Sequence, residues 1–157
     1  MTDTAQPWTD AMRLALEEAH LAAQEDEVPV GAVVVRRSDG AVIGRGRDRK
    51  MALHDPTAHA EVLALREAAQ AMGDWRLEGC VLVVTLEPCP MCAGAAVMAR
   101  VDEIVYGAAN PKFGATGSLI DLPACAPWNH RAQVTGGVLA EECAAVLKSY
   151  FRAKRKG

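Results

Sequence analysis

The sequence lacks any apolar run near the roughly 18 to 20 residues that a membrane span needs, so we expect no membrane partner. Residues 1–10 are polar and acidic, without the basic and apolar segments of a secretory signal, and we therefore expect a cytoplasmic protein. Repeats, low-complexity segments and internal domain boundaries are also missing. The 157 residues are thus predicted to form one domain, 1–157, which is long enough to bury a core.

Cysteine is present in an odd number, five, which disfavours a disulfide framework in a protein without an export signal. Cys80 begins an apolar run and is predicted to be a buried strand residue, and Cys143 is predicted to pack in a helix. Cys125 lies in a proline-rich loop and is interpreted only as a free thiol. Cys89 and Cys92 remain, and their close spacing favours metal binding or catalysis.

Acidic residues are absent after Glu142, although the chain holds 20 of them against 17 basic residues, a formal net charge of −3. Residues 1–147 hold all 20 acids and 12 basic residues, a net −8, whereas residues 148–157 hold the other five basic residues, a net +5. A basic tail on an acidic body favours a local anionic partner. Solvated cations at the end of a helix explain the same composition equally well.

Hydrophobic spacing predicts nine elements in the order helix, strand, strand, helix, strand, helix, strand, strand, helix. The expected bounds are 8–25, 28–35, 41–47, 55–73, 80–86, 88–100, 103–107, 133–136 and about 139–155. Asp55-Pro56 and Pro88 are expected to begin the two middle helices. The order predicts a three-layer α/β/α fold, with helices on both faces of a mixed sheet of about five strands. Gly44 and Gly46 predict a bulge or a close approach in the second strand.

Two short motifs carry the chemistry, His59-Ala60-Glu61 and Pro88-Cys89-Pro90-Met91-Cys92. One imidazole and two thiolates near helix N-termini form a three-ligand zinc site, whose fourth position can hold a water. Glu61 lies beside this site and can move a proton to and from that water. The alternative is a structural zinc site with a fourth ligand, for which the candidates are Cys80, Cys125, His54 and His130.

The sequence resembles the bacterial tRNA-specific adenosine deaminases, members of the zinc-dependent cytidine and deoxycytidylate deaminase superfamily, over roughly residues 8–155. The zinc motif marks the superfamily, whereas Asn129-His130-Arg131 and the aromatic and basic C-terminal helix favour the tRNA branch. The matching stretches are 27–33, 54–61, 85–89, 91–95, 117–119, 129–131, 142–145 and 150–152.

The resemblance implies hydrolytic deamination of adenosine to inosine at the wobble position of a tRNA anticodon, with release of ammonia. It implies one Zn²⁺ per subunit on His59, Cys89 and Cys92, Glu61 as the proton shuttle, and a cytidine-deaminase-like fold. The partners implied are a tRNA anticodon stem-loop and a second copy in a homodimer. The expected substrate contacts are Val28, Asp48, Ala60, Glu87, Pro88, Asn110, Lys112, Phe151 and Arg152.

Two positions depart from the family pattern, because Asp48 stands where Asn is common and Asn110 stands where many relatives have Asp. Asp48 gives some support to an alternative function, deamination of a free nucleobase or nucleoside of the guanine or cytosine type. The basic and aromatic C-terminal helix opposes this alternative. A second alternative is a zinc-bearing RNA-binding module without catalysis, which Glu61 opposes because a structural site needs no proton shuttle.

Overall fold

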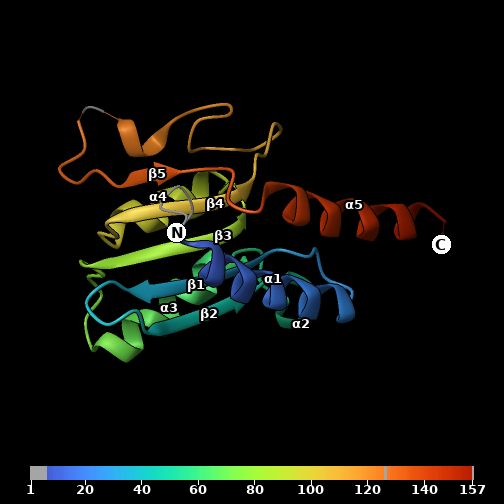
Figure 1. The fold of residues 1–157 in the computed structure, drawn as a ribbon, viewed down its shortest axis with the longest axis horizontal. Helices are drawn as coiled ribbons and strands as arrows, with labels where there is room; N and C mark the ends of the chain where they lie inside the picture. Colours follow the sequence, from blue (N-terminus) through green and yellow to red (C-terminus); the bar gives the residue numbers. More distant parts are fainter. Residues whose placement is uncertain (1–6, 126, 157) are drawn as a thin grey trace, which may run out of the picture.

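One mixed sheet forms the centre of the molecule in the computed structural model, which describes residues 7–125 and 127–156 (Figure 1). Within that part of the chain the sheet has five strands in the order β2-β1-β3-β4-β5. β1 is antiparallel to β2 and β3, whereas β3, β4 and β5 are parallel. The strands are β1 Gly31–Arg36, β2 Val42–Arg47, β3 Cys80–Leu86, β4 Glu103–Ala108 and β5 Gln133–Thr135.

Helices cover both faces of the sheet, so the predicted three-layer α/β/α fold is confirmed (Figure 1). On one face lie α1, Thr9–Gln24, and α5, Ala140–Lys156, which pack with Val33 and Val83. On the other lie α3, Ala60–Met72, and α4, Pro90–Met98, which pack with the alternate strand residues Val34 and Leu82. The near-continuous apolar strands follow from this arrangement, because both faces of β1 and β3 are buried.

The glycines of β2 let α3 lie directly on the sheet, which confirms the expected close approach. A Cβ atom on Gly46 would lie 2.2 Å from the carbonyl oxygen of Ala60, and one on Gly44 would lie 2.3 Å from that of Ala64. Side chains at these two positions would therefore push α3 away from β2. This contact fixes the first turn of α3, where one of the two chemical motifs lies.

Both middle helices begin later than predicted. α3 begins at Ala60 after the N-cap residue His59, and α4 begins at Pro90 after the N-cap residue Cys89. Asp55 does not cap a helix, because its carboxylate accepts hydrogen bonds from the backbone N–H and the hydroxyl of Thr57, at 2.8 and 2.7 Å, and closes a turn.

A short helix that the sequence did not predict, α2 at Lys50–Leu53, precedes this turn. Its first backbone N–H groups donate to the buried carboxylate of Glu27, from Met51 at 3.2 Å and from Ala52 at 2.8 Å. The cap of α2 is thus supplied by a residue far back in the sequence, so local patterns could not indicate this helix. The long loop after β4 likewise contains a 3₁₀ turn, η1, at Leu122–Ala124.

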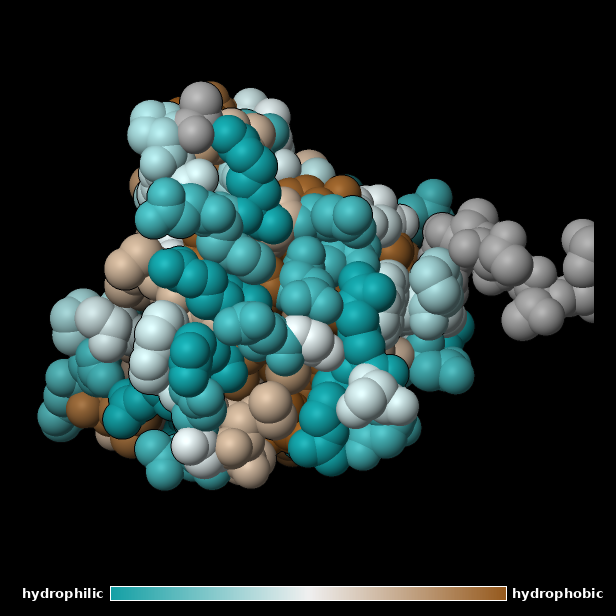
Figure 2. Space-filling view, turned by 90° about the vertical axis from the view of Figure 1, so that its left-hand side faces the viewer, coloured by the Kyte–Doolittle hydropathy of each residue, from teal (hydrophilic) through white to brown (hydrophobic). Residues whose placement is uncertain are grey.

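The end of the molecule away from the C-terminus of α5 is covered mainly by hydrophilic side chains (Figure 2). The turn between β1 and β2 lies at this end, and its Arg36 and Asp39 form an ion pair at 2.8 Å. At the opposite end, the last turns of α5 extend past the sheet (Figure 1). Among the helices of the described residues, none is long and apolar enough to cross a membrane.

Candidate active site

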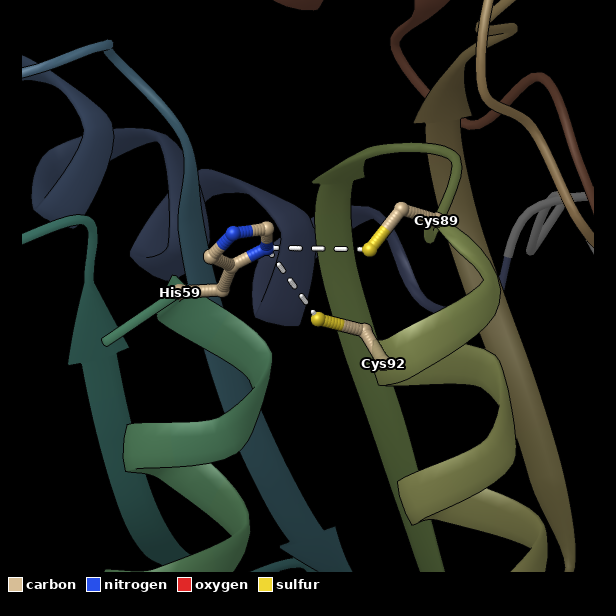
Figure 3. Close-up of side chains that lie close together, drawn as sticks. All are labelled: His59, Cys89 and Cys92. Carbon is tan, nitrogen blue, oxygen red and sulfur yellow. Dashed lines mark hydrogen bonds between the residues drawn. The ribbon is translucent and has the colours of Figure 1, made fainter. Parts of the chain in front are cut away.

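Three side chains with metal-binding atoms converge where β3 ends and α3 and α4 begin (Figure 3). The Nδ1 atom of His59 lies 3.4 Å from the Sγ of Cys92 and 3.7 Å from the Sγ of Cys89. His59 and Cys89 are the N-cap residues of α3 and α4, both with extended backbone, and Cys92 lies in the first turn of α4. Two helix N-termini, with their positive dipole ends, therefore face one point.

This donor set fits a zinc ion. Tetrahedral zinc, with a bond of about 2.05 Å to nitrogen and about 2.3 Å to sulfur, separates the nitrogen from the sulfur by about 3.6 Å. The two observed separations, 3.4 and 3.7 Å, lie on either side of that value. Among residues 7–125 and 127–156, this is the one group of at least three His, Cys, Asp or Glu side chains close enough together to hold a metal.

The charges of the cluster also suit a cation. The pKa of the Cys89 thiol is lowered to about 4, because Cys92 and His59 both donate hydrogen bonds to its thiolate. The same thiolate, together with burial and Glu61, raises the pKa of Cys92, and the hydrogen bond to Cys89 raises the pKa of His59. A second thiolate is thus disfavoured until a positive charge compensates it, which a divalent ion would do.

The alternative fourth ligands do not join the cluster. Cys80 is buried at the start of β3, and Cys125 lies at the end of η1. His130 makes a hydrogen bond of 2.6 Å with the carbonyl oxygen of Val101, and His54 is exposed after α2. The arrangement therefore leaves room for a fourth, non-protein ligand, as catalytic zinc sites do.

Glu61 lies in the first turn of α3 with only 4% of its surface exposed. Burial, reinforced by the negative charges of Asp48 and Cys89, raises the pKa of its carboxyl group to about 7. A carboxyl group with this pKa can both take up and release a proton near neutral pH. Asp48, itself buried, accepts a hydrogen bond from the backbone N–H of Ala60 at 2.9 Å and pairs with Lys50 at 2.8 Å.

A cleft of about 900 Å³ opens from the cluster. Most of the predicted substrate contacts line it together with His59, Glu61 and Cys89, namely Val28, Asp48, Glu87, Asn110, Lys112 and Phe151. Ala60 and Pro88 are buried and are not among the lining residues, whereas Arg152 lines an adjoining groove of about 700 Å³. Apart from the buried Ala60 and Pro88, the structure therefore brings the predicted residues together at the carboxyl ends of β3 and β4. Ligands commonly bind at this edge of α/β sheets.

Glu87 organises the loop that forms one wall of the cleft. Its buried carboxylate accepts hydrogen bonds from the backbone N–H groups of Asn110, Thr116 and Ser118, at 3.0 to 3.1 Å, and from the hydroxyl of Ser118. Burial raises the pKa of Glu87, but these donors outweigh it and the net pKa is lowered. The Asn110 side chain accepts hydrogen bonds from the N–H groups of Lys112 and Phe113, so it also shapes this loop.

Sequence reasoning did not predict several residues that line the cleft, including Lys50, Met91, Phe113 and Lys148. Lys148 belongs to the basic tail, so its charge was the available signal. Phe113 is 64% exposed in the loop beside Lys112, and an exposed aromatic residue next to a basic one could have indicated it. Four basic residues also lie at positions 45, 47, 49 and 50, and two of them are paired within the chain, since Arg47 contacts Glu25 and Glu18 and Lys50 contacts Asp48.

The fold and the site together define a deaminase, and a sequence model of the MafB19-like deaminases matches residues 6–155. The chain belongs to this family and, within it, to the group of the bacterial tRNA-specific adenosine deaminases. It is 48% identical over 145 residues to the tRNA-specific adenosine deaminase of Bacillus subtilis, which covers 92% of this chain and 89% of the relative. It is also 53% identical to tRNA(Ile)-lysidine synthase of Deinococcus radiodurans, but spans only 26% of that protein.

Solved structures agree with this assignment. A structure from a study of A-to-I editing by tRNA:A34 deaminases has 45% identity and a TM-score of 0.84, with 88% of this chain and 99% of that chain covered. The guanine deaminase of Nitrosomonas europaea has 28% identity and a TM-score of 0.76, with 90% of this chain and 83% of that chain covered.

Proposed function

We propose that this protein deaminates adenosine to inosine at the wobble position of a tRNA anticodon by zinc-dependent hydrolysis, with release of ammonia. The observation that carries the proposal is one cleft, lined both by Glu61 and residues of the His59, Cys89 and Cys92 cluster and by the basic Lys148 and aromatic Phe151 of α5. The relatives named as tRNA-specific adenosine deaminases support the choice of reaction and substrate.

His59, Cys89 and Cys92 would hold one Zn²⁺ per subunit, through Nδ1 of the histidine and both sulfur atoms. Bound zinc supplies a water of low pKa at neutral pH. The buried carboxyl group of Glu61 would carry the two protons of the attacking water in turn, the first to the adenine ring and the second to the departing amine, and would return to its starting protonation state. The pKa of about 7 suits both transfers, because a group near the working pH gives and takes protons with similar ease.

The outer part of the cleft suits a single-stranded RNA loop. Phe151 is 45% exposed and can stack on a base, and Lys112, Lys148 and Arg152 can meet phosphates. Asp48 and Asn110 line the same cleft, where they would contact the base or ribose. An anticodon loop presents bases that are already unstacked, so moving one adenine into the site costs little.

We further propose a homodimer in the cytoplasm. Met91 and Met98 of α4 are 37% and 63% exposed, whereas Val97 of the same helix belongs to the core of the subunit. Exposed methionines on a helix beside the site suit a second subunit.

The direct test is to incubate the purified protein with an anticodon stem-loop RNA that carries adenosine at the wobble position. Inosine in the RNA and one ammonia per inosine are the expected products. A matched stem-loop with guanosine at that position should release none. Ammonia from free guanine, cytosine or adenosine at a higher kcat/KM than from the RNA would contradict the proposal.

Deamination of free guanine is the second candidate, and two observations favour it. The fold is similar to a guanine deaminase, and Asp48 presents a carboxylate to the cleft. The same ammonia assay separates the two candidates, because it compares kcat/KM for free guanine directly with kcat/KM for the RNA.

A further inference from the structure

The second half of α5 has little packing of its own. In its first half, Cys143 is buried against Gly107 of β4 and Leu147 is half-buried. From residue 148 to residue 156, Tyr150 is the one residue that is not exposed. This half extends past the sheet beside the end of α1 (Figure 1). Its position therefore depends on few contacts.

Those contacts meet at Asp26, which follows α1. The hydroxyl of Tyr150 donates to the carbonyl oxygen of Asp26 at 3.2 Å and to its Oδ1 at 3.4 Å, and the Nζ of Lys154 lies 2.5 Å from Oδ1. Asp26 has φ of +61°, a backbone conformation that asparagine and glycine tolerate better than most residues. One exposed acid thus connects the end of α1 to two successive turns of α5.

Tyr150, which contacts Asp26, is next to Phe151, which lines the cleft. The rings of Tyr150 and Phe151 are 5.3 Å apart at an interplanar angle of 78°. Phe151 and Lys148 line the cleft, whereas Tyr150 lies against Asp26. A helix held by Tyr150 and Lys154 must present Phe151 and Lys148 in a fixed direction.

We infer that Asp26 is a positioning residue, which fixes the second half of α5 so that Phe151 and Lys148 face the substrate, and thereby sets the affinity for the RNA. The inference rests on the proposed function. Asp26 touches no reacting atom, so we expect its effect to appear in KM and not in kcat.

The direction in which KM changes when Asp26 is replaced shows whether Asp26 acts by positioning α5 or only through its negative charge. Asp26 is an acid beside a basic helix that would bind a polyanion. If charge alone mattered, its removal would strengthen RNA binding and lower KM. If Asp26 holds α5, its removal lets Phe151 and Lys148 move, and KM rises.

The test compares Asp26→Gly, Asp26→Asn and the wild type on the anticodon stem-loop RNA. Glycine tolerates the positive φ and removes the carboxylate that accepts from Tyr150 and pairs with Lys154, leaving only the backbone carbonyl oxygen for Tyr150. Asparagine removes the same charge but keeps a side-chain oxygen acceptor. We expect Asp26→Gly to raise KM by about three- to tenfold with kcat changed less than about twofold, and Asp26→Asn to lie between it and the wild type. Amide hydrogen exchange in residues 148–156 should be faster in Asp26→Gly.

Glu142→Gln is the matched control, because it breaks another contact between α1 and α5, the 3.7 Å ion pair with Arg13, near the well-packed start of α5. It should leave KM and hydrogen exchange unchanged. An unchanged or lower KM in Asp26→Gly, or equal KM values for Asp26→Gly and Asp26→Asn, would overturn the inference. No deamination of the RNA by the wild type would instead overturn the proposed function, and with it any role of Asp26 in that reaction.

Discussion

His59 and Cys89 show how single residues place the proposed chemistry. Each is the N-cap of its helix, so its side chain leaves the backbone at the point where the first N–H groups have no partner within the helix. The pKa of the Cys89 thiol is lowered to about 4, first by the hydrogen bond from the Cys92 side chain and then by those from His59 and from the backbone N–H of Cys92 in the first turn of α4. Glu61 and Cys92 then lie in the first turns of the same helices, which keeps all four groups together.

Glu61→Gln should lower kcat on the stem-loop RNA by about 10²- to 10⁴-fold, because the amide cannot carry the proton. The zinc content should stay at that of the wild type, since Glu61 is not a proposed ligand. Inosine formation and metal analysis on the same preparation give both values. Glu67→Gln in the same helix is the control, because Glu67 is exposed and its oxygen can still accept from the Arg45 N–H. Inosine formation at the wild-type rate in Glu61→Gln would refute the proton-shuttle role.

Glu87→Gln should lower the free energy of unfolding by about 2 kcal/mol at pH 7, because the buried carboxylate loses part of its hydrogen bonding with Ser118 and the loop backbone. The folded-state pKa of Glu87 is below its ordinary value of 4.5. Its stabilisation is therefore complete above pH 4.5 and is lost as the pH falls through the lowered pKa.

Denaturant titrations at several pH values test this expectation. The difference between wild type and Glu87→Gln should be constant from pH 7 to about pH 5, and should shrink as the pH falls from 4.5 through the folded-state pKa. Glu78→Gln, at an exposed position, should show no such difference. A difference that grows as the pH falls would mean that the protonated carboxyl group is the stabilising form.

At the scale of elements, the metal cluster connects two helices that have few other contacts with each other. His59 comes from the start of α3, and Cys89 and Cys92 come from the start of α4 (Figure 3). Each helix is otherwise packed on the sheet, through Ala64 of α3 and Ala96 of α4 among others. We therefore expect the metal to stabilise the fold without being required for it.

Cys89→Ser should lose zinc and activity and lower the Tm by about 5 to 10 °C, since a bound ion stabilises only the folded state. Treating the wild type with a chelator should give a similar Tm, and adding Zn²⁺ should restore it. Cys125→Ser is the matched control and should keep one zinc per subunit. Zinc retained in Cys89→Ser, or lost in Cys125→Ser, would contradict the proposed ligand set.

The elements that the sequence predicted are those set by local patterns. β3 matches its predicted bounds because its apolar run is continuous, and α3 lies on β2 as Gly44 and Gly46 indicated. α2 was missed because its cap comes from Glu27, which is distant in sequence. The cluster could be predicted from motif spacing, but the contact of Tyr150 with Asp26 joins segments 124 residues apart and left no local signal.

At the scale of the whole molecule, positive charge is concentrated beside the cleft that would bind RNA, whereas the rest of the chain is negatively charged. The last ten residues carry a net +5, and their helix borders the cleft at one end of the molecule. The remaining residues carry a net −8, which opposes nonspecific contact with a polyanion elsewhere. RNA should therefore approach from the end that holds α5 and Lys112.

Replacing both Lys148 and Arg152 by glutamine tests this division. The two cations line the cleft and the adjoining groove, so the double variant should raise KM for the RNA and make binding less sensitive to salt. The slope of log K against log salt concentration should fall in magnitude by about 1.5, as expected for two lost phosphate contacts. Filter binding or fluorescence anisotropy between low and physiological salt measures this slope.

The control is the double variant Arg13→Gln with Arg66→Gln, which removes the same charge from exposed positions that line neither groove. If the net charge of the molecule governs RNA binding, both double variants will reduce the slope equally. If the position of the charge governs it, only the change at Lys148 and Arg152 will do so. We expect the second result, because the Debye length of about 8 Å at physiological salt limits exposed charges to local effects.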